Sequence, residues 1–402
     1  MKKPLDGVRV LDFSHALAGP YCTMLMAAYG ASVFKIEGIG AIDMGRTWGP
    51  PFQGGEASYF LGINSGKQSV SIDLKHPEGL ALCLRLVQQA DVFIENFRPG
   101  AMTRLGLGYD VVRRLNPRMV YCSISGYGQF GPRRDDPAMD LILQASSGLI
   151  SVTGTPDGHL ARCGHSVADI TAGMSSLIGI LMALRVREQT GVGQHIDVSM
   201  LDSMISAMAS NFANFLGSGI VPKPLGTAFS TIVPYAAFPT KDREIAIAVA
   251  SEKLWATFCQ AIGKPQWTSD PRFASNPLRV ANRGILEPMI VEVFRTRTAD
   301  EWTAHFKQSG IPCTPVRTLD EVVADPQTEE RHMFPIVQHP SAGPIRVTGV
   351  PLKLSETPGA ISEPAPLLGQ HTRQALQTLL GLPDQEIDEL NAAGVLKTLP
   401  TP

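Results

Sequence analysis

Short apolar, β-branched runs alternate with helical patterns through the first third of the chain. Residues 21–29 are predicted to form a helix opened by Gly19-Pro20. Residues 77–90 repeat apolar positions at helical spacing, and Pro77 with Glu78 suits the first turn of this second helix. Five runs around these helices are predicted to be strands: 8–13, 31–37, 69–75, 91–97 and 119–125. Alternation at this pitch indicates βαβ units, so we predict an α/β fold with a Rossmann-like, parallel-sheet large domain.

The pattern loosens in the second half of the chain. Residues 170–187 predict a long apolar helix, but the segment 217–239 is rich in Gly, Pro, Ser and Thr, and we interpret it as the exit from the large domain. A strand at 244–250 and three helical patterns then predict a smaller α+β domain. The remaining tail is broken by Pro and Gly and contains one clear helix, too little for a third core. The predicted parts are a large domain at 1–220, a small domain at 221–325, and a C-terminal segment, 326–402, that returns to the large domain.

Composition narrows the class of protein. Of 402 residues, 44% are hydrophobic, enough for a sizeable core, and 35 Lys and Arg against 37 Asp and Glu leave a net charge of -2. No block is strongly basic, so a dedicated nucleic-acid binder is not expected. The start lacks the apolar stretch of a signal peptide, and the uncharged stretch 13–34 is broken by polar residues and by Gly19-Pro20. We therefore expect a cytoplasmic protein with no membrane partner.

Common cofactor and metal motifs are missing from the sequence. The six cysteines are widely spaced with no CxxC pair, and the turn at 15–20 has no GxGxxG for a nicotinamide dinucleotide. Residues 62–68 approach a P-loop, but the run is one residue short and Gln68 replaces the Ser or Thr that binds magnesium. No GxSxG, HExxH or EF-hand loop occurs. We expect no bound metal, no nucleotide triphosphatase and no NAD-type oxidoreductase.

Polar side chains gather where the predicted strands end. In open parallel sheets, ligands bind beyond the carboxyl ends of the strands. That edge would carry the following residues: His15, Lys75, Asn96, Phe97, Arg98 and, a few residues on, Arg104. Several cations beside an aromatic ring suit a phosphorylated, nucleotide-like ligand. The alternative is that Lys75 and Arg104 are simply the solvated ends of their elements.

Asp169 is the carboxylate of greatest interest, because it directly precedes the long apolar helix. Backbone N–H groups and the helix dipole hold a carboxylate ionised at such a position. Asp169 is therefore either a helix N-cap alone or a nucleophile able to attack a thioester carbonyl. Gly173, one turn further on, would let a ligand approach the helix closely. Asp140 also opens a helical pattern, and we interpret it as a cap.

Several of these segments resemble the family III CoA-transferases, the group that contains carnitine and formyl-CoA transferases. The resemblance extends in the same order over nearly the whole chain. It is carried by these stretches: Leu11-Asp12-Phe13-Ser14-His15, Ala18-Gly19-Pro20, Val33-Phe34-Lys35-Ile36-Glu37, Ser71-Ile72-Asp73-Leu74-Lys75, Glu95-Asn96-Phe97-Arg98-Pro99-Gly100, Gly126-Tyr127-Gly128-Gln129, Ala168-Asp169-Ile170-Thr171-Ala172-Gly173 and Pro366-Leu367-Leu368-Gly369-Gln370-His371-Thr372.

The resemblance implies that Asp169 is the catalytic nucleophile, which forms a mixed anhydride with the acyl group and then an aspartyl-CoA thioester. Coenzyme A is then a substrate that carries the acyl group, no cofactor is tightly bound, and a small carboxylic acid is the second substrate. The family also implies a homodimer of two interlocked rings. The positions matching its CoA site are His15, Ala18, Ile72, Lys75, Asn96, Phe97, Arg98 and Arg104.

Substrate choice rests on finer resemblances. Residues 46–51, 225–228 and 232–235 look like members that use succinyl-CoA and C4–C6 dicarboxylates, and Arg46 could clamp the remote carboxylate of a diacid. The other interpretation of Arg46 is an exposed loop arginine. Gly38 and Leu17 depart from the CoA contacts of the formyl-CoA branch.

The sequence leaves two alternatives to a transferase. The α-methylacyl-CoA racemases of the same family place a His directly before the Asp that matches Asp140, as one of two bases. Here Met139 occupies that position and cannot carry a proton, although as a substrate contact it would still line the site. The second alternative is a non-catalytic paralogue that only binds acyl-CoA; retention of Asp169 speaks against it.

Overall fold

The computed structural model describes residues 2–399, and the chain divides into two compact units. The large unit contains residues 2–149, 162–220 and 326–399, and the small unit contains residues 150–161 and 221–325. Each unit has its own apolar core.

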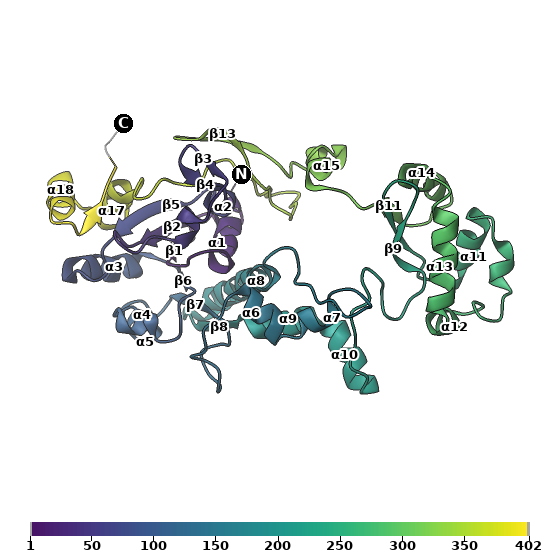
Figure 1. Ribbon diagram of the computed structural model, residues 1–402. Helices are drawn as coiled ribbons and strands as arrows, with labels where there is room; N and C mark the ends of the chain where they lie inside the picture. Colours follow the sequence, from purple (N-terminus) through teal and green to yellow (C-terminus); the bar gives the residue numbers. More distant parts are fainter. Residues whose placement is uncertain (1, 400–402) are drawn as a thin grey trace. The chain divides into compact units, whose positions relative to one another are not determined.

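The large unit is built on a sheet of seven strands, six of them parallel (Figure 1). Along the sheet the order is β14-β5-β2-β1-β6-β7-β8, which places the six parallel strands in the 3-2-1-4-5-6 order of a Rossmann fold. The strand order reverses between β1 and β6. The strands are β1 (Arg9–Asp12), β2 (Ser32–Glu37), β5 (Gln68–Ile72), β6 (Val92–Glu95), β7 (Val120–Ser125), β8 (His195–Ser199) and β14 (Leu396–Lys397). The prediction of an α/β fold with a parallel-dominated sheet is confirmed.

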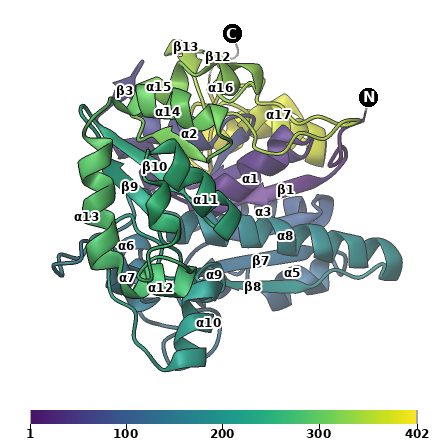
Figure 2. The same ribbon diagram turned by 90° about the vertical axis from the view of Figure 1, so that its right-hand side faces the viewer.

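Helices cover both faces of this sheet, which explains why its strands are apolar along their whole length. On one face, α3 (Pro77–Gln89), α5 (Tyr109–Leu115) and α17 (Thr372–Leu380) share a core with strand residues such as Tyr121. The next residue, Cys122, points to the other face, where its thiol contacts Ser176. That face is covered by α1 (Ala18–Ala28) and α8 (Val167–Thr190), which run alongside each other (Figure 2).

Within residues 2–399, α8 is the one helix that is long and apolar enough to cross a membrane by length and composition. It packs on α1, on β7 and β8, and on α9 (Met200–Ala207). The core helix of a globular unit meets the same length and composition test.

The C-terminal part of the large unit contains more regular structure than the sequence predicts. Besides α17 it forms β12 (Ile336–His339), β13 (Gly343–Arg346), α18 (Asp384–Ala392) and the antiparallel edge strand β14. Figure 1 shows α17 and α18, in yellow, near β5 and α3. The segment is anchored along β5 because the N–H of His371 donates to the carbonyl of Ser69, while His371 Nδ1 and Thr372 Oγ1 accept from the N–H groups of Ser69 and Ser71.

The small unit packs helices on a three-stranded antiparallel sheet. Its strands are β9 (Tyr235–Pro239), β10 (Glu244–Ala248) and β11 (Cys313–Pro315), and its main helices are α11 (Glu252–Ala261), α13 (Arg283–Phe294) and α14 (Ala299–Gln308). Aromatic rings fill the core, with Phe294 and Phe306 5.7 Å apart between ring centroids. The prediction of a loose exit over 217–239 is wrong for its last five residues, which form β9.

The remaining short elements complete the chain. They are η1 (Met44–Thr47), β3 (Phe52–Gln53), β4 (Glu56–Ala57), α2 (Ser58–Ile63), α4 (Ala101–Arg104), α6 (Asp140–Ser146), α7 (Leu149–Val152), α10 (Ala209–Ser218), η2 (Pro265–Thr268), α12 (Asn276–Ala281), α15 (Leu319–Val323) and α16 (Pro326–Glu330).

Candidate active site

Two cavities lie at the carboxyl ends of the parallel strands in the large unit. The larger one, of about 560 Å³, is lined by Asp169 together with residues that follow β1 and β6. The smaller one, of about 290 Å³, is lined by Lys75 and Gly38 among others. His15 and Phe97 line both cavities, and their rings meet edge to face with centroids 5.1 Å apart. An extended ligand could therefore occupy both cavities past this pair.

The turn after β1 is tied to the turn after β6, at the point where the strand order reverses. The backbone N–H of His15 donates to Asn96 Oδ1, and Asn96 Nδ2 donates to the carbonyl of His15, both at 2.8 Å. The next residue, Ala16, has a φ of 61°, a left-handed conformation that is uncommon for a residue with a Cβ atom. Its N–H donates to Asp43 Oδ1 at 2.9 Å, which holds this conformation in place.

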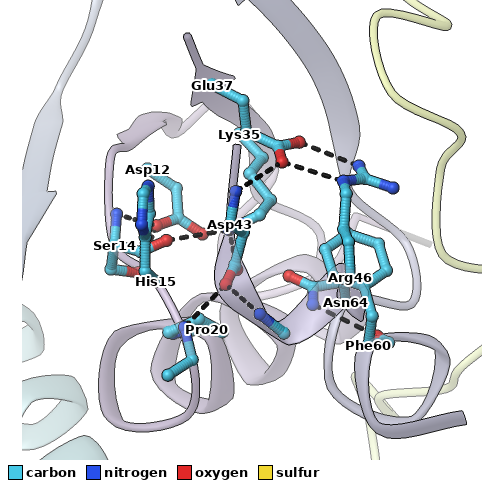
Figure 3. A network of polar contacts seen from close by, with 12 residues as sticks. Asp12, Ser14, His15, Pro20, Lys35, Glu37, Asp43, Arg46, Phe60 and Asn64 are labelled. Atoms are coloured by element: carbon cyan, nitrogen blue, oxygen red, sulfur yellow. Dashed lines mark hydrogen bonds and ion pairs between the residues drawn. The ribbon is translucent and has the colours of Figure 1, made fainter. Parts of the chain in front are cut away.

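A buried network of charges supports this turn (Figure 3). Lys35 Nζ lies 2.8 Å from Asp43 Oδ2 and donates to the carbonyl of Ser14, and Lys67 Nζ lies 3.0 Å from Asp12 Oδ2. Burial would raise the pKa of Asp12, but Lys67 and Lys35 lower it well below its usual range. Burial lowers the pKa of Lys67 to about 8. The network therefore consists of paired ions, as buried charges require.

Arg46 belongs to this network and does not face the cavities. Its Nε and Nη2 atoms each donate to a different carboxylate oxygen of Glu37 at 2.8 Å, its Nη1 donates to the carbonyl of Pro366, and its guanidinium lies 3.8 Å from the ring centre of Phe60. The residue is 8% exposed. This geometry speaks against both sequence interpretations, the substrate clamp and the exposed loop arginine, because the buried Arg46 guanidinium already binds the carboxylate of Glu37.

Asp169 is the third residue of α8, whose N-cap is Ser166, so the interpretation of Asp169 as the N-cap is wrong. Its half-buried carboxylate also receives a hydrogen bond from the backbone N–H of Ala18, the first residue of α1. Backbone N–H groups at the start of a helix are predicted to hold such a carboxylate ionised. Burial and the nearby Asp140 outweigh them and raise the pKa of Asp169 to about 7.

Asp140 does cap a helix, but not the one it begins. It is the first residue of α6, and its Oδ1 atom accepts a hydrogen bond at 2.9 Å from the N–H of Ala168 in the first turn of α8. Its Oδ2 atom accepts from Gln144 Nε2 at 2.7 Å. Asp140 therefore satisfies an N–H group beside Asp169 while placing a like charge near it.

Gly173 serves helix packing, which corrects the expectation that it admits a ligand. A Cβ atom at this position would stand 2.6 Å from the carbonyl oxygen of Ala18 and 3.2 Å from the ring of Tyr21. The missing side chain lets α1 approach α8 closely. Since Ala18 donates to Asp169, this close approach also fixes the site.

Of the other predicted residues, Lys75, Arg98 and Met139 line one of the two cavities, whereas Arg104 and Ile72 line neither. Lys75 and Arg98 are exposed and line the smaller and the larger cavity respectively, and Arg104 is exposed at the end of α4. None of these three side chains forms an ion pair with another described residue, so each is free to meet an anion. Met139 lines the larger cavity and is 61% exposed. Ile72 is fully buried in the core, which leaves only its backbone for a ligand.

Trp48 and Tyr59 also line the larger cavity and were not singled out from the sequence. Their rings meet edge to face with centroids 5.0 Å apart. Burial, followed by the charge of Asp169, raises the pKa of Tyr59 further above its usual value, so its hydroxyl stays protonated and can donate a hydrogen bond. The sequence signal for Trp48 is its place two residues after Arg46, in the stretch 46–51 that resembles members using dicarboxylates.

Comparisons with known proteins agree on the family of this chain. The family model for CoA-transferase family III matches residues 5–372. The succinyl-CoA:glutarate CoA-transferase of Homo sapiens is 37% identical over 98% of this chain and 90% of that protein. The succinate–glutarate CoA-transferase of Agrobacterium fabrum is 38% identical over 94% of this chain and 96% of that protein.

A solved structure agrees with these relatives. The crystal structure of a CAIB/BAIF family protein from Brucella suis superposes with a TM-score of 0.85 at 35% sequence identity, over 94% of this chain and 100% of that one. The resemblance drawn from the motifs is thereby confirmed. The chain belongs to CoA-transferase family III.

Proposed function

We propose that this enzyme moves CoA from succinyl-CoA to a small dicarboxylic acid, with Asp169 as the nucleophile. The observation that carries the proposal is Asp169 itself, a carboxylate in a cavity at the switch point of a Rossmann-like sheet. The names of the human and Agrobacterium relatives support succinyl-CoA and a C5 dicarboxylate as substrates.

The proposed reaction exchanges acyl groups on Asp169. The ionised Asp169 carboxylate attacks the thioester carbonyl of succinyl-CoA, and CoA leaves as the thiolate, which gives a mixed anhydride. The thiolate then attacks the Asp169 carbonyl, so succinate leaves and an aspartyl-CoA thioester forms. The acceptor carboxylate attacks this thioester, and the released thiolate takes the acceptor's acyl group from the second anhydride. Asp169 is regenerated and no water is consumed.

We propose that the CoA molecule lies across both cavities. Lys75 and Arg98 line the two cavities and Arg104 is exposed at the end of α4; none of the three forms an ion pair with a described residue, so they suit the phosphate groups of CoA. Phe97 and His15 would flank the pantetheine arm where the cavities adjoin. Trp48, Tyr59 and Met139 would bound the space for the acyl group beside Asp169.

We propose further that the large unit is the CoA-binding and catalytic domain and that two chains form a homodimer. An apolar stripe on α8 supports the dimer, because a contiguous exposed apolar patch commonly marks a surface through which proteins associate. The stripe follows helical spacing along one face and consists of Met174, Ile178, Leu181, Met182 and Val186, all exposed in the single chain. The interlocked arrangement follows from the family resemblance.

The test is CoA exchange followed by mass spectrometry. Purified enzyme receives succinyl-CoA and, one at a time, glutarate, itaconate, mesaconate or citramalate. We expect a new dicarboxylyl-CoA with the wild type and none with Asp169→Ala. An Asp110→Ala variant, which changes an exposed aspartate of α5, serves as the matched control. Exchange that survives in Asp169→Ala would remove Asp169 from the mechanism, and failure of every acceptor would remove the proposed substrate class.

A further inference from the structure

Gln144 is a fully buried amide one turn along α6 from Asp140. Its side chain bridges α6 and the segment that leads to Asp169. Nε2 donates to Asp140 Oδ2 at 2.7 Å and to the carbonyl of His165 at 3.4 Å, and Oε1 accepts from the N–H of Cys163 at 2.8 Å. All the contacts of the amide therefore lie within the surroundings of Asp169.

The partners of Gln144 fix the orientation of its amide. An ionised Asp140 carboxylate only accepts hydrogen bonds, and the backbone N–H of Cys163 only donates. The amide must therefore point Nε2 toward Asp140 and Oε1 toward Cys163. A carboxylate at this position could not donate to Asp140, an apolar side chain could bond to neither partner, and Asn is one methylene too short to span the same gap.

These contacts hold both ends of the segment 163–168. Gln144 binds its beginning at Cys163, and Asp140, itself oriented by Gln144, binds its end at Ala168. Asp169 is the next residue. We propose that Gln144 is a positioning residue that fixes the nucleophile Asp169 through this segment and through Asp140. The inference rests on the proposed role of Asp169.

Positioning of this kind has a large effect on a reaction that needs a carboxylate oxygen close to a thioester carbonyl. A displacement of about 1 Å from the reactive geometry costs on the order of 10²-fold in rate. From outside α8, the carboxylate of Asp169 is held by a hydrogen bond from the N–H of Ala18 within the described part of the chain, so few other contacts would keep it in place. Loss of Gln144 should therefore slow the chemical step more than it weakens CoA binding.

The first experiment compares chemistry with binding in Gln144→Met and Gln144→Glu. Each full-length variant is mixed with succinyl-CoA alone, the enzyme–CoA adduct is followed by intact mass, and the Kd of free CoA is measured by calorimetry. We expect the adduct to form on the order of 10²-fold more slowly, with the Kd of CoA changed less than about twofold. An adduct rate within about threefold of the wild type would overturn the proposal, and so would a Kd that rises in proportion.

A matched control separates positioning from general stability. Asn116 is a partly buried amide of the large unit that bridges two backbone carbonyls, those of Val87 and Ala90, away from the cavities. Asn116→Leu should lower Tm while the adduct rate stays that of the wild type. A drop in rate that follows Tm across all variants would identify Gln144 as merely structural.

The second experiment exchanges the carboxylate of Asp140 and the amide of Gln144 between the two positions. In Asp140→Asn with Gln144→Glu, the new Asn Oδ1 still accepts from Ala168, its Nδ2 donates to the new Glu, and the Glu still accepts from Cys163. The double variant should recover at least about tenfold of the rate lost in Gln144→Glu alone, since coupled hydrogen-bonded pairs are not additive. No recovery would contradict the bridge.

Hydrogen exchange tests the inference independently of turnover. Gln144→Met should speed amide exchange in the peptide that contains residues 163–169 and leave peptides of α3 unchanged. Unchanged exchange at 163–169 would overturn the positioning role even in an active enzyme. Wild-type enzyme that forms no CoA adduct, together with faster exchange in Gln144→Met, would instead refute the proposed function and leave the structural bridge intact.

Discussion

At the scale of single residues, the site depends on a carboxylate whose surroundings oppose its charge. Burial and Asp140 raise the pKa of Asp169 to about 7, whereas the proposed reaction needs the ionised form. We predict that kcat/KM for succinyl-CoA rises with pH up to about 7 and then levels off. In Asp140→Asn the like charge is removed, so the rise should move to lower pH. A pH profile measures both, with Asp110→Asn as control, and an unmoved profile would contradict the role of Asp140.

The same shift predicts a stability gain when the charge is removed. Because the folded pKa of Asp169 lies above its ordinary value of 3.8, the native state binds the proton more tightly, and ionisation destabilises the fold as pH rises from about 4 to 7. Asp169→Asn should therefore be inactive but more stable at pH 8, by about 2 kcal/mol after allowance for partial exposure. Thermal unfolding at pH 8 and pH 4 checks this, since no gain is expected at pH 4.

Arg46 allows a direct choice between a structural role and a substrate role. Arg46→Met would leave the buried Glu37 carboxylate without its bidentate partner, so we expect a loss of about 3–5 kcal/mol in unfolding free energy. Selectivity among dicarboxylates should not change. Arg98→Met offers the contrast: a higher KM for acyl-CoA with unchanged Tm, because Arg98 is exposed at the larger cavity. If Arg46→Met instead had a normal Tm and a raised KM for the acceptor, the interpretation of Arg46 as a clamp for the acceptor carboxylate would be correct.

Sequence reasoning located those site residues whose position follows from strand ends alone. His15 and Asn96 follow adjacent strands β1 and β6, so the sheet pattern brings them together. It could not find Gln144, Asp43 or Tyr59, because the contacts of each are with residues that only folding brings near. It also mistook Arg46, since nothing in a loop sequence shows that Glu37 lies within reach of its guanidinium.

At the scale of elements, the contact between α1 and α8 links helix packing to the position of Asp169. In Gly173→Ala the new Cβ would stand 2.6 Å from a backbone oxygen, so one helix must move and carry the Ala18 N–H away from Asp169. We predict a loss of about 1–3 kcal/mol in stability together with slower adduct formation. Gly284→Ala, in α13 with no atom near the added Cβ, should instead gain up to about 1 kcal/mol. Denaturant unfolding and the adduct assay check both variants.

The elements that sequence analysis found are those with long, continuous patterns. Parallel strands covered on both faces are apolar throughout, and α3 has a clear helical repeat. Strands β9 and β14 were missed for different physical reasons. In β9, Pro and Gly in the flanking chain hid a short run, and β14 has two residues whose strand conformation comes from pairing with β5.

At the scale of the whole molecule, the apolar stripe on α8 predicts association. Leu181→Asp together with Met182→Glu should break the proposed dimer, because each places a charge where an apolar contact is expected. Light scattering after size exclusion should show a shift from twice the chain mass toward 43.2 kDa. Arg185→Glu with Glu188→Arg, an exposed ion pair on the same helix, is the control. A wild-type monomer would contradict the proposed homodimer.

The late position of β14 in the chain has a consequence for biosynthesis. Strand β5 leaves the ribosome early, but within residues 2–399 its outer edge is paired by the late strand β14 and by the turn at His371 and Thr372. A nascent chain therefore carries an open strand edge through nearly the whole of its translation. Such edges pair readily with other chains. We expect the newly made enzyme to depend on chaperones during translation, and early termination before β14 to yield aggregates.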